Sequence, residues 1–185
     1  MESCIRYNSN GYVQLYYDGK WNNWLDSKTT EDDVYTQYLY YKGTNYTDIC
    51  GNWEPYAYRA SGSSNSTKAP TVTMGSSYMT LKQPGETGAG LHGSVWSQYS
   101  IDLTNYNYIE INYTTTLSVS TATCSLRLSP TKQNNYTHLT ALSTGMKSTS
   151  NTTATVDISG VTGKYYILFA MYYCSTKIYS IKLIR

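Results

Sequence analysis

Hydrophobic and polar positions alternate along most of this chain with the two-residue period of a β-strand. The clearest run is Tyr106-Asn-Tyr-Ile-Glu-Ile-Asn-Tyr113, in which aromatic and β-branched residues are interleaved with polar ones. Such runs are typical of strands that have one face in the core and one face in water. Tyrosine suits these positions because its ring is apolar while its hydroxyl needs water or a hydrogen-bond partner.

Turn residues divide the pattern into short segments at intervals of roughly 8–12 residues. Helical periodicity is nearly absent, and helix-forming residues such as Leu, Ala, Glu and Lys are sparse. We therefore predict an all-β domain folded as an antiparallel β-sandwich or jelly roll. The predicted strands are Tyr38–Tyr41, Trp53–Arg59, Thr71–Met74, Tyr78–Lys82, Gly93–Ile101, Tyr106–Leu117, Thr123–Leu128, Thr137–Leu142, Ala154–Ile158, Lys164–Tyr173 and Lys177–Ile184.

An aromatic hairpin is predicted near the N-terminus, where Asp18-Gly19 separates two aromatic runs. A lone hairpin is only marginally stable in water, so we expect this one to dock on the main body or on a partner chain. Tyr16, Trp21 and Trp24 are the candidate docking residues, because large aromatic side chains supply much of the binding energy of interfaces. Packing within the chain is the alternative.

The domain boundary is expected after residues 26–33, a polar and acidic stretch without an apolar period. The prediction is an anchoring segment at residues 1–33, followed by a β-sandwich domain at residues 34–185. Strands rich in Tyr and Thr leave edges that need cover, and the low charge gives little protection against edge pairing. We therefore expect a homo-oligomer.

Composition narrows the classes of function. Charged residues make up 14% of the chain, against about 25% in an average soluble protein. The formal net charge of +2 comes without a Lys/Arg stripe, so we predict no nucleic-acid binding. The longest apolar stretch, Tyr165–Tyr172, is too short to span a membrane. Residues Met1–Arg6 lack a basic segment followed by an apolar one, so no signal peptide is predicted.

No catalytic or metal-binding constellation stands out in the sequence. His92 and His138 are the two histidines, and no nucleophile motif such as Gly-x-Ser-x-Gly accompanies them. Glu110 with Asp102 or Asp157 is the combination of carboxylates nearest to a glycosidase pair. Nothing resembles a metal-ligand cluster. We therefore expect a protein that is not an enzyme and has no cofactor.

The cysteines lie far apart in the sequence and form no Cys-x-x-Cys pair, which argues against a zinc knuckle or a redox motif. Cys124 and Cys174 each lie in an apolar strand pattern. Two interpretations stand: these two are neighbours across a sheet, or the thiols are buried and free and act as small apolar residues.

A first candidate ligand site is aromatic. Trp53 is followed by Tyr56, Tyr58 and Arg59, which together would form a platform for a sugar ring. Neutral Asn, Ser, Thr and Tyr side chains reach sugar hydroxyls at a lower desolvation cost than charged groups. The alternative is that Trp53, in its Gly-Asn-Trp turn, fills the end of the sandwich.

A second candidate ligand site follows the glycine-rich stretch at residues 85–90. His92 and Trp96 lie directly after it, and glycines allow a backbone to approach a ligand closely. Glycines also serve any sharp turn, which is the alternative.

Three segments carry a resemblance to a known family. Tyr38-Leu-Tyr-Tyr-Lys-Gly-Thr-Asn-Tyr-Thr-Asp-Ile-Cys-Gly-Asn-Trp53 resembles the Leu-Tyr-x-x-Gly…Gly-Trp opening of β-sandwich domains in tail-associated proteins of phages and prophages of Gram-positive bacteria. Residues 156–169 with 178–183 look like the closing strands of a galactose-binding-like jelly roll, and residues 100–106 resemble the entry to its central strand. Asn52 departs from the pattern, since a second Gly is usual there.

The resemblance covers about residues 36–185 and implies a galactose-binding-like β-sandwich in a virion or tail-associated structural protein. Its implied partners are other virion proteins and a host-surface glycan, and its implied location is the phage particle. Such domains often hold a structural calcium, although no Asp-rich loop here calls for one. A purely architectural decoration or head-fibre protein without a glycan ligand is the alternative.

Overall fold

The computed structural model describes residues 5–7, 13–17, 20–23, 36–58, 69–83, 92–133 and 145–185. The chain divides into two compact units, Met1–Gln37 and Tyr38–Arg185. The boundary expected from the sequence lies between residues 33 and 34.

The N-terminal unit contains a three-stranded antiparallel sheet of β1 (Ile5–Tyr7), β2 (Val13–Tyr17) and β3 (Lys20–Asn23). Tyr17 pairs with Lys20 on either side of Asp18-Gly19, which confirms the predicted hairpin. The short strand β1, which pairs with β2, was not predicted.

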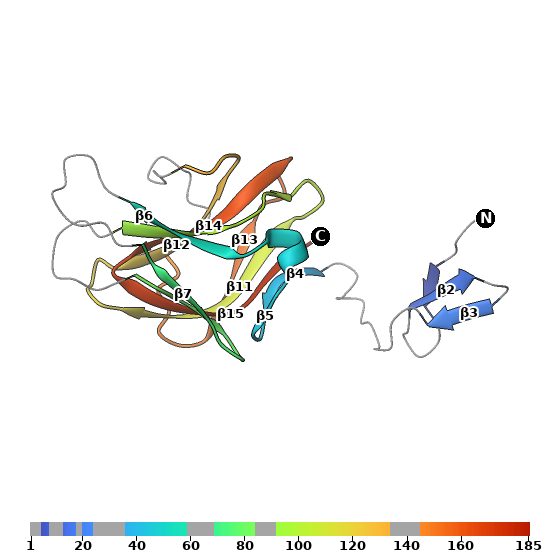
Figure 1. The fold of residues 1–185 in the computed structure, drawn as a ribbon, viewed down its shortest axis with the longest axis horizontal. Helices are drawn as coiled ribbons and strands as arrows, with labels where there is room; N and C mark the ends of the chain where they lie inside the picture. The colour runs from blue at the N-terminus through green and yellow to red at the C-terminus, as the bar shows by residue number, and fades with distance from the viewer. Residues whose placement is uncertain are drawn as a thin grey trace. The chain divides into compact units, whose positions relative to one another are not determined.

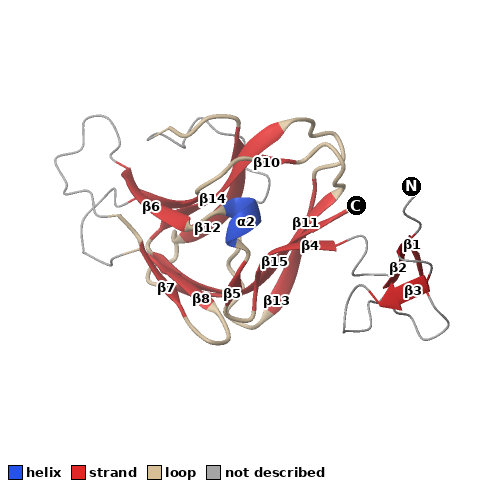
Figure 2. Cartoon of the chain, turned by 45° about the vertical axis from the view of Figure 1, so that its right-hand side comes forward, coloured by secondary structure: helices blue, strands red, loops and turns tan. Residues whose placement is uncertain are grey.

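The second unit is built from two sheets (Figures 1 and 2). In the larger sheet, the hydrogen-bonded order is β13, β11, β15, β4 and β5, and β8 pairs with both β15 and β7. Its seven strands are β4 (Thr36–Tyr41), β5 (Thr44–Asn45), β7 (Thr71–Met74), β8 (Met79–Lys82), β11 (Tyr108–Leu117), β13 (Thr152–Asp157) and β15 (Cys174–Ile184).

The smaller sheet has five strands. β6 pairs with β9, β9 with β14 and β14 with β12, all antiparallel. The two-residue strand β10 also pairs with β14. The strands are β6 (Trp53–Tyr58), β9 (His92–Ser97), β10 (Ile101–Asp102), β12 (Thr123–Ser129) and β14 (Lys164–Tyr172). The short helix α2 (Thr47–Cys50) connects β5 to β6.

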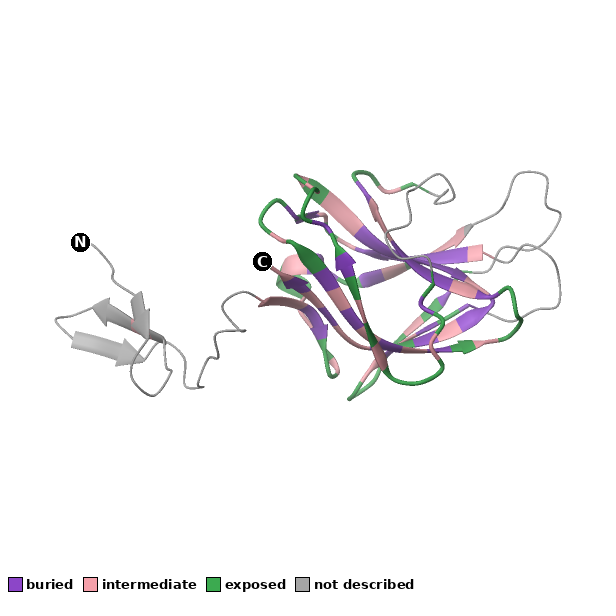
Figure 3. Ribbon diagram, turned by 180° about the vertical axis from the view of Figure 1, so that it is seen from behind, coloured by how far each residue is buried: buried purple, intermediate pink, exposed green. Residues whose placement is uncertain are grey.

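The main core lies between these two sheets (Figure 3). β11 shows the alternation that the sequence predicts: Ile109 and Ile111 are fully buried, whereas Glu110 and Asn112 are partly exposed. Phe169 of β14 is buried from the opposite sheet. Each such side chain stabilises the fold by about 1.5–3 kcal/mol. The predicted all-β antiparallel sandwich of jelly-roll type is therefore confirmed.

The remaining expectations about elements have mixed outcomes. β7 has the predicted bounds, whereas the single strand predicted at Gly93–Ile101 is divided into β9 and β10 by a turn. Helix α2 and strand β5 were not predicted. The strand predicted at Thr137–Leu142 lies outside the described residues.

The cysteines of the second unit are buried and free: Cys50, Cys124 and Cys174 form no disulfide in this structure. Their burial agrees with the interpretation of these thiols as small apolar residues. Burial raises the pKa of the Cys50 thiol to about 11. Within the described ranges, no helix is long and apolar enough to cross a membrane.

Candidate functional site

Trp53 lies in the core. Its side chain is 4% exposed, its ring centre lies 5.7 Å from that of Phe169, and its Nε1 donates a hydrogen bond to Asn45 Oδ1 at 3.1 Å. A ring this buried offers no face to a sugar. This corrects the expectation of a platform at Trp53 and agrees with the alternative, in which Trp53 is a packing residue.

The outer face of the five-stranded sheet carries a different candidate site. Because successive residues of a strand point to opposite faces, Val95 and Phe169 join the main core, while Trp96, Leu168 and Ala170 form a second buried cluster. The outer face of this sheet, formed by β6, β9, β14 and β12, therefore lies away from the core between the sheets.

Strand register aligns polar and aromatic residues in rows across this outer face, with neighbouring strands about 4.8 Å apart. The first row contains Thr123, Tyr172 and His92; the second contains Ser125, Ala170, Ser94 and Tyr56; the third contains Arg127, Leu168, Trp96 and Glu54.

Trp96 forms the floor of this face. It is 1% exposed, and the rings of Tyr56 and Tyr166 meet it edge-on with ring centres 6.4 Å away in both cases. Its Nε1 donates a hydrogen bond to Ser94 Oγ at 2.7 Å. Trp96 was expected to contact a ligand directly, but its burial gives it a supporting role beneath the surface residues.

An ion pair covers one end of the aromatic cluster. Lys132 Nζ lies 2.6 Å from Glu54 Oε2, and the Tyr56 hydroxyl donates to the same oxygen at 3.1 Å. The Lys132 ammonium also lies 5.1 Å from the centre of the Tyr166 ring, within range of a cation–π interaction. The hydrogen bond from Lys132 lowers the pKa of the Glu54 carboxyl.

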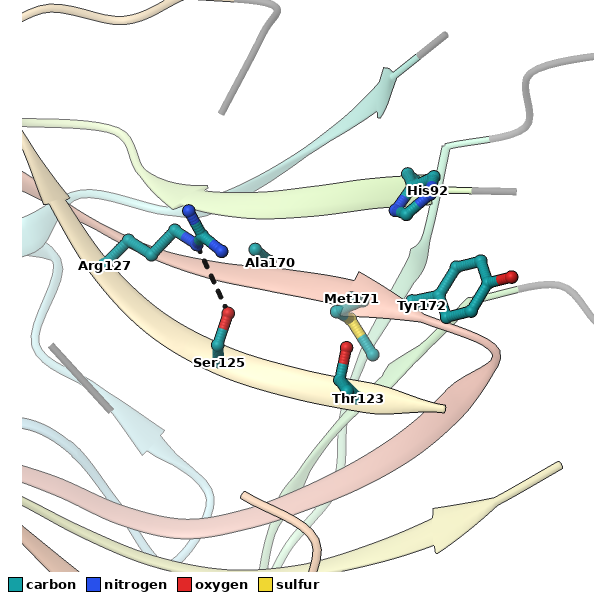
Figure 4. Close-up of a pocket in the computed structure, with 7 residues that line it drawn as sticks. All are labelled: His92, Thr123, Ser125, Arg127, Ala170, Met171 and Tyr172. Carbon is teal, nitrogen blue, oxygen red and sulfur yellow. Dashed lines mark hydrogen bonds between the residues drawn. The ribbon is translucent and has the colours of Figure 1, made fainter. Parts of the chain in front are cut away.

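A cavity of about 200 Å³ opens beside this cluster on the same face of the sheet (Figure 4). Its walls come from the edge strand β12, from β14 and from the first residue of β9. The lining residues are His92, Thr123, Ser125, Arg127, Ala170, Met171 and Tyr172.

The polar groups of the cavity have defined positions. The His92 ring stacks on Tyr172 with centres 4.5 Å apart and planes 21° apart. Burial lowers the pKa of His92, so its imidazole is mainly neutral at pH 7. Arg127 Nε donates to Ser125 Oγ at 3.3 Å, which orients the guanidinium (Figure 4). The cavity thus combines a cation, an imidazole and hydroxyl groups.

Of the predicted ligand contacts that the structure describes, His92 lines the cavity, and Tyr56 lies in the adjacent aromatic cluster. The glycine-rich stretch that drew attention to His92 is outside the described residues. Also outside them are Arg59, Trp24 and the side chains of Tyr58, Tyr16 and Trp21.

Sequence reasoning missed the contribution of β12. Thr123, Ser125 and Arg127 alternate with Cys124 and Leu126, so their side chains share the face opposite the core. That alternation was a usable signal, because it places an arginine and two hydroxyls on one side of a strand. The sequence does not reveal that β14 is the neighbour of that strand.

The carboxylates considered for a glycosidase pair make other contacts. Glu110 forms an ion pair with Lys182 at 2.8 Å. Asp102 and Asp157 each accept a hydrogen bond from the backbone amide and the hydroxyl of the residue two positions later, and these bonds lower the pKa of both carboxyls. In the part of the chain that the structure describes, no His, Cys, Asp or Glu side chains gather in a group suited to a metal ion.

Comparison with known proteins yields matches of structure alone. No protein-family model and no curated protein matches the sequence. A lysine-to-alanine variant of CBM29-2, a family 29 carbohydrate-binding module, is 10% identical, with a TM-score of 0.51 over 80% of this chain and 90% of the module. An aspartate-to-alanine variant of CBM29-2 is also 10% identical, with a TM-score of 0.51 over 80% of this chain and 83% of the other.

At this level of identity the likeness concerns the fold. The second unit of the chain has the β-sandwich fold of these carbohydrate-binding modules.

Proposed function

We propose that this chain is a non-catalytic carbohydrate-binding protein whose ligand lies on the outer face of the five-stranded sheet. The observation that carries the proposal is the cavity of about 200 Å³ between His92, Tyr172 and Arg127. Small-molecule sites are concave and combine apolar surface with a few placed polar groups, which is the composition of this cavity.

The chemistry of the lining suits a saccharide. Sugar hydroxyls need both donors and acceptors, and Thr123, Ser125 and Tyr172 each provide a hydroxyl that does both. Arg127 adds a fixed fork of donors. The similarity of fold to modules named for carbohydrate binding supports the same class of ligand.

The biological setting that we propose is a phage or prophage particle, with the β-sandwich displayed outward toward a host-surface glycan. The support is the resemblance of Tyr38–Trp53 to the opening segment of phage tail-associated domains. Under this proposal, the N-terminal unit anchors the chain to a neighbouring virion protein through its aromatic hairpin. Immunogold labelling of intact particles tests the setting, and particles that never carry the label would contradict it.

Retention on polysaccharides tests the binding function. The chain is applied to immobilised neutral and acidic bacterial cell-wall polysaccharides, and we expect at least one to retain it. We expect Arg127→Ala and Tyr172→Ala to weaken that retention roughly thirtyfold, which is the size of an interface hot spot. Tyr108→Ala is the matched control, because Tyr108 is 41% exposed on β11 of the other sheet.

The outcomes distinguish the proposed location of the binding site from carbohydrate binding itself. Equal weakening by Tyr108→Ala and Tyr172→Ala would mean that the ligand binds elsewhere. Failure of every polysaccharide to retain the chain would overturn carbohydrate binding and favour the architectural alternative.

A further inference from the structure

Two cysteines meet where the chain passes from one sheet to the other. Cys124 belongs to β12 of the five-stranded sheet, and Cys174 is the first residue of β15 in the seven-stranded sheet. Between β14 and β15 stands Tyr173, whose φ of 47° turns the chain toward the second sheet. The pair therefore lies at a corner of the sandwich, where a covalent bond would join its two layers.

A hydrogen bond places the Cys174 side chain beside the backbone of Cys124. Cys174 Sγ donates a hydrogen bond to the carbonyl oxygen of Thr123 at 3.2 Å, and that carbonyl belongs to the peptide group that leads into Cys124. The two thiols also interact electrostatically, and this interaction shifts the pKa of each. Both face the interior, since Cys124 is 0% exposed and Cys174 is 1% exposed.

The surroundings of the pair are polar for a core. Thr176 follows Cys174 by two residues and is fully buried, and its hydroxyl is 3.1 Å from that of the buried Thr115. The interaction between the two thiols lowers the pKa of Cys174 and raises that of Cys124. Cys174 is therefore the thiol that ionises first, and the thiolate is the reactive form.

We propose that Cys124 and Cys174 form an oxidisable pair that closes into a disulfide between the two sheets. The oxidant belongs to the class of small-molecule disulfides, such as oxidised glutathione. Because both sulfur atoms are buried, the reaction takes place during folding or when this corner opens locally. The proposal does not depend on carbohydrate binding.

The reaction proceeds by two exchanges. The Cys174 thiolate attacks one sulfur of the small disulfide, a mixed disulfide forms, and one small thiolate leaves. Cys124 loses its proton and attacks the sulfur of Cys174, which releases the second small thiolate. In total the two protein thiols lose two electrons and two protons, and one small disulfide becomes two thiols.

Refolding of the full chain under defined redox conditions tests the proposal. The chain is unfolded in denaturant and refolded either in a reductant or in a buffer of reduced and oxidised glutathione. In the oxidised sample we expect two of the four thiols to disappear. Peptide mapping should then find Cys124 linked to Cys174. The melting temperature should rise by about 10 °C, because the bond closes a long loop of the unfolded chain.

Cysteine variants provide the controls. Cys50→Ala should still lose two thiols on oxidation, whereas Cys124→Ala should lose none. A wild-type chain that keeps all four thiols, or that links Cys50 or Cys4 instead, would overturn the proposal. The wild-type measurement decides the matter even where a variant fails to fold. A bond that forms without raising the melting temperature would overturn its role as a brace between the sheets.

Discussion

The Asn45 side chain stabilises the turn that leads into the five-stranded sheet, which carries the candidate site. Its Nδ2 donates to the Gly51 carbonyl at 3.0 Å, and its Oδ1 accepts a hydrogen bond from Trp53 Nε1 at 3.1 Å. Gly51 has a φ of 67°, a left-handed conformation that glycine adopts readily. These contacts set the entry into β6 and account for the Lys-Gly-Thr-Asn…Gly-Asn-Trp pattern of this segment.

We expect Asn45→Ala to destabilise the second unit by about 1–3 kcal/mol, because the buried Trp53 N–H loses its acceptor. Denaturant unfolding followed by tryptophan fluorescence measures the effect. Asn52→Ala is the control, since Asn52 is exposed, and its cost should stay within about 0.5 kcal/mol. Equal losses in the two variants would contradict the role of Asn45.

The ion pair of Glu54 and Lys132 predicts a pH dependence. Because the pKa of Glu54 is lowered in the fold, its contribution to stability is complete above the ordinary value of 4.5 and is lost as the pH falls through the lower folded value. At pH 7 the wild type should exceed Glu54→Gln in stability by up to about 1 kcal/mol. The difference should shrink as the pH is lowered from 7 to 3. Urea unfolding at both values checks this, and a difference that does not change with pH would refute it.

At the scale of elements, strand β9 connects the core to the candidate site. His92, Ser94 and Trp96 face outward, and the residues between them face the core. One of these, Gly93, lies against Pro70 and Gln83: a Cβ placed there would come within 2.5 Å of Pro70 Cδ and closer still to the Gln83 side chain. A residue without a side chain is therefore required.

Gly93→Ala should cost about 1–3 kcal/mol of stability, because the added methyl forces Pro70 or the strand to move. Gly160→Ala is the matched control, since a Cβ at Gly160 meets nothing within 4 Å. Thermal unfolding of the two variants makes the comparison. If Gly93→Ala melts with the wild type, the close approach at this position is not a constraint.

Sequence periodicity predicted strands better than it predicted where strands are interrupted. The alternation of Gly93–Ile101 continues through the turn between β9 and β10, so one strand was expected. In the structure, Ser97 Oγ accepts a hydrogen bond from the Ile167 amide at 3.1 Å and donates to the Tyr99 carbonyl at 2.9 Å. A contact with a residue 70 positions away therefore stabilises this turn, and the local pattern of residues does not predict that contact.

At the scale of the whole molecule, the chain divides into two units, each with its own internal residue contacts. Each is compact by its own internal contacts, and the boundary lies at Gln37 and Tyr38. The core residues that the structure describes in the second unit, including Leu39, Phe169 and Ile181, all follow this boundary. The sandwich therefore contains its own core.

We expect a chain of residues 38–185 to fold by itself and to melt cooperatively within a few degrees of the full chain. Circular dichroism should show a spectrum dominated by β-structure, and differential scanning calorimetry should give a single transition. The same fragment should retain its polysaccharide binding, since the cavity lies within it. Loss of cooperative unfolding in the fragment would show that the N-terminal unit completes the fold.

The sequence by itself determined the class of the fold, because alternation with period two and turn residues are local properties that each strand expresses alone. It also placed the hairpin at Asp18-Gly19. Tertiary structure decided which aromatic residues lie on the surface and which lie in the interior. Trp53 and Trp96 are buried because side chains from other strands cover them. Tertiary structure also decided the cavity, whose walls come from β9, β12 and β14. Their adjacency depends on long-range pairing, which no short pattern in the sequence specifies.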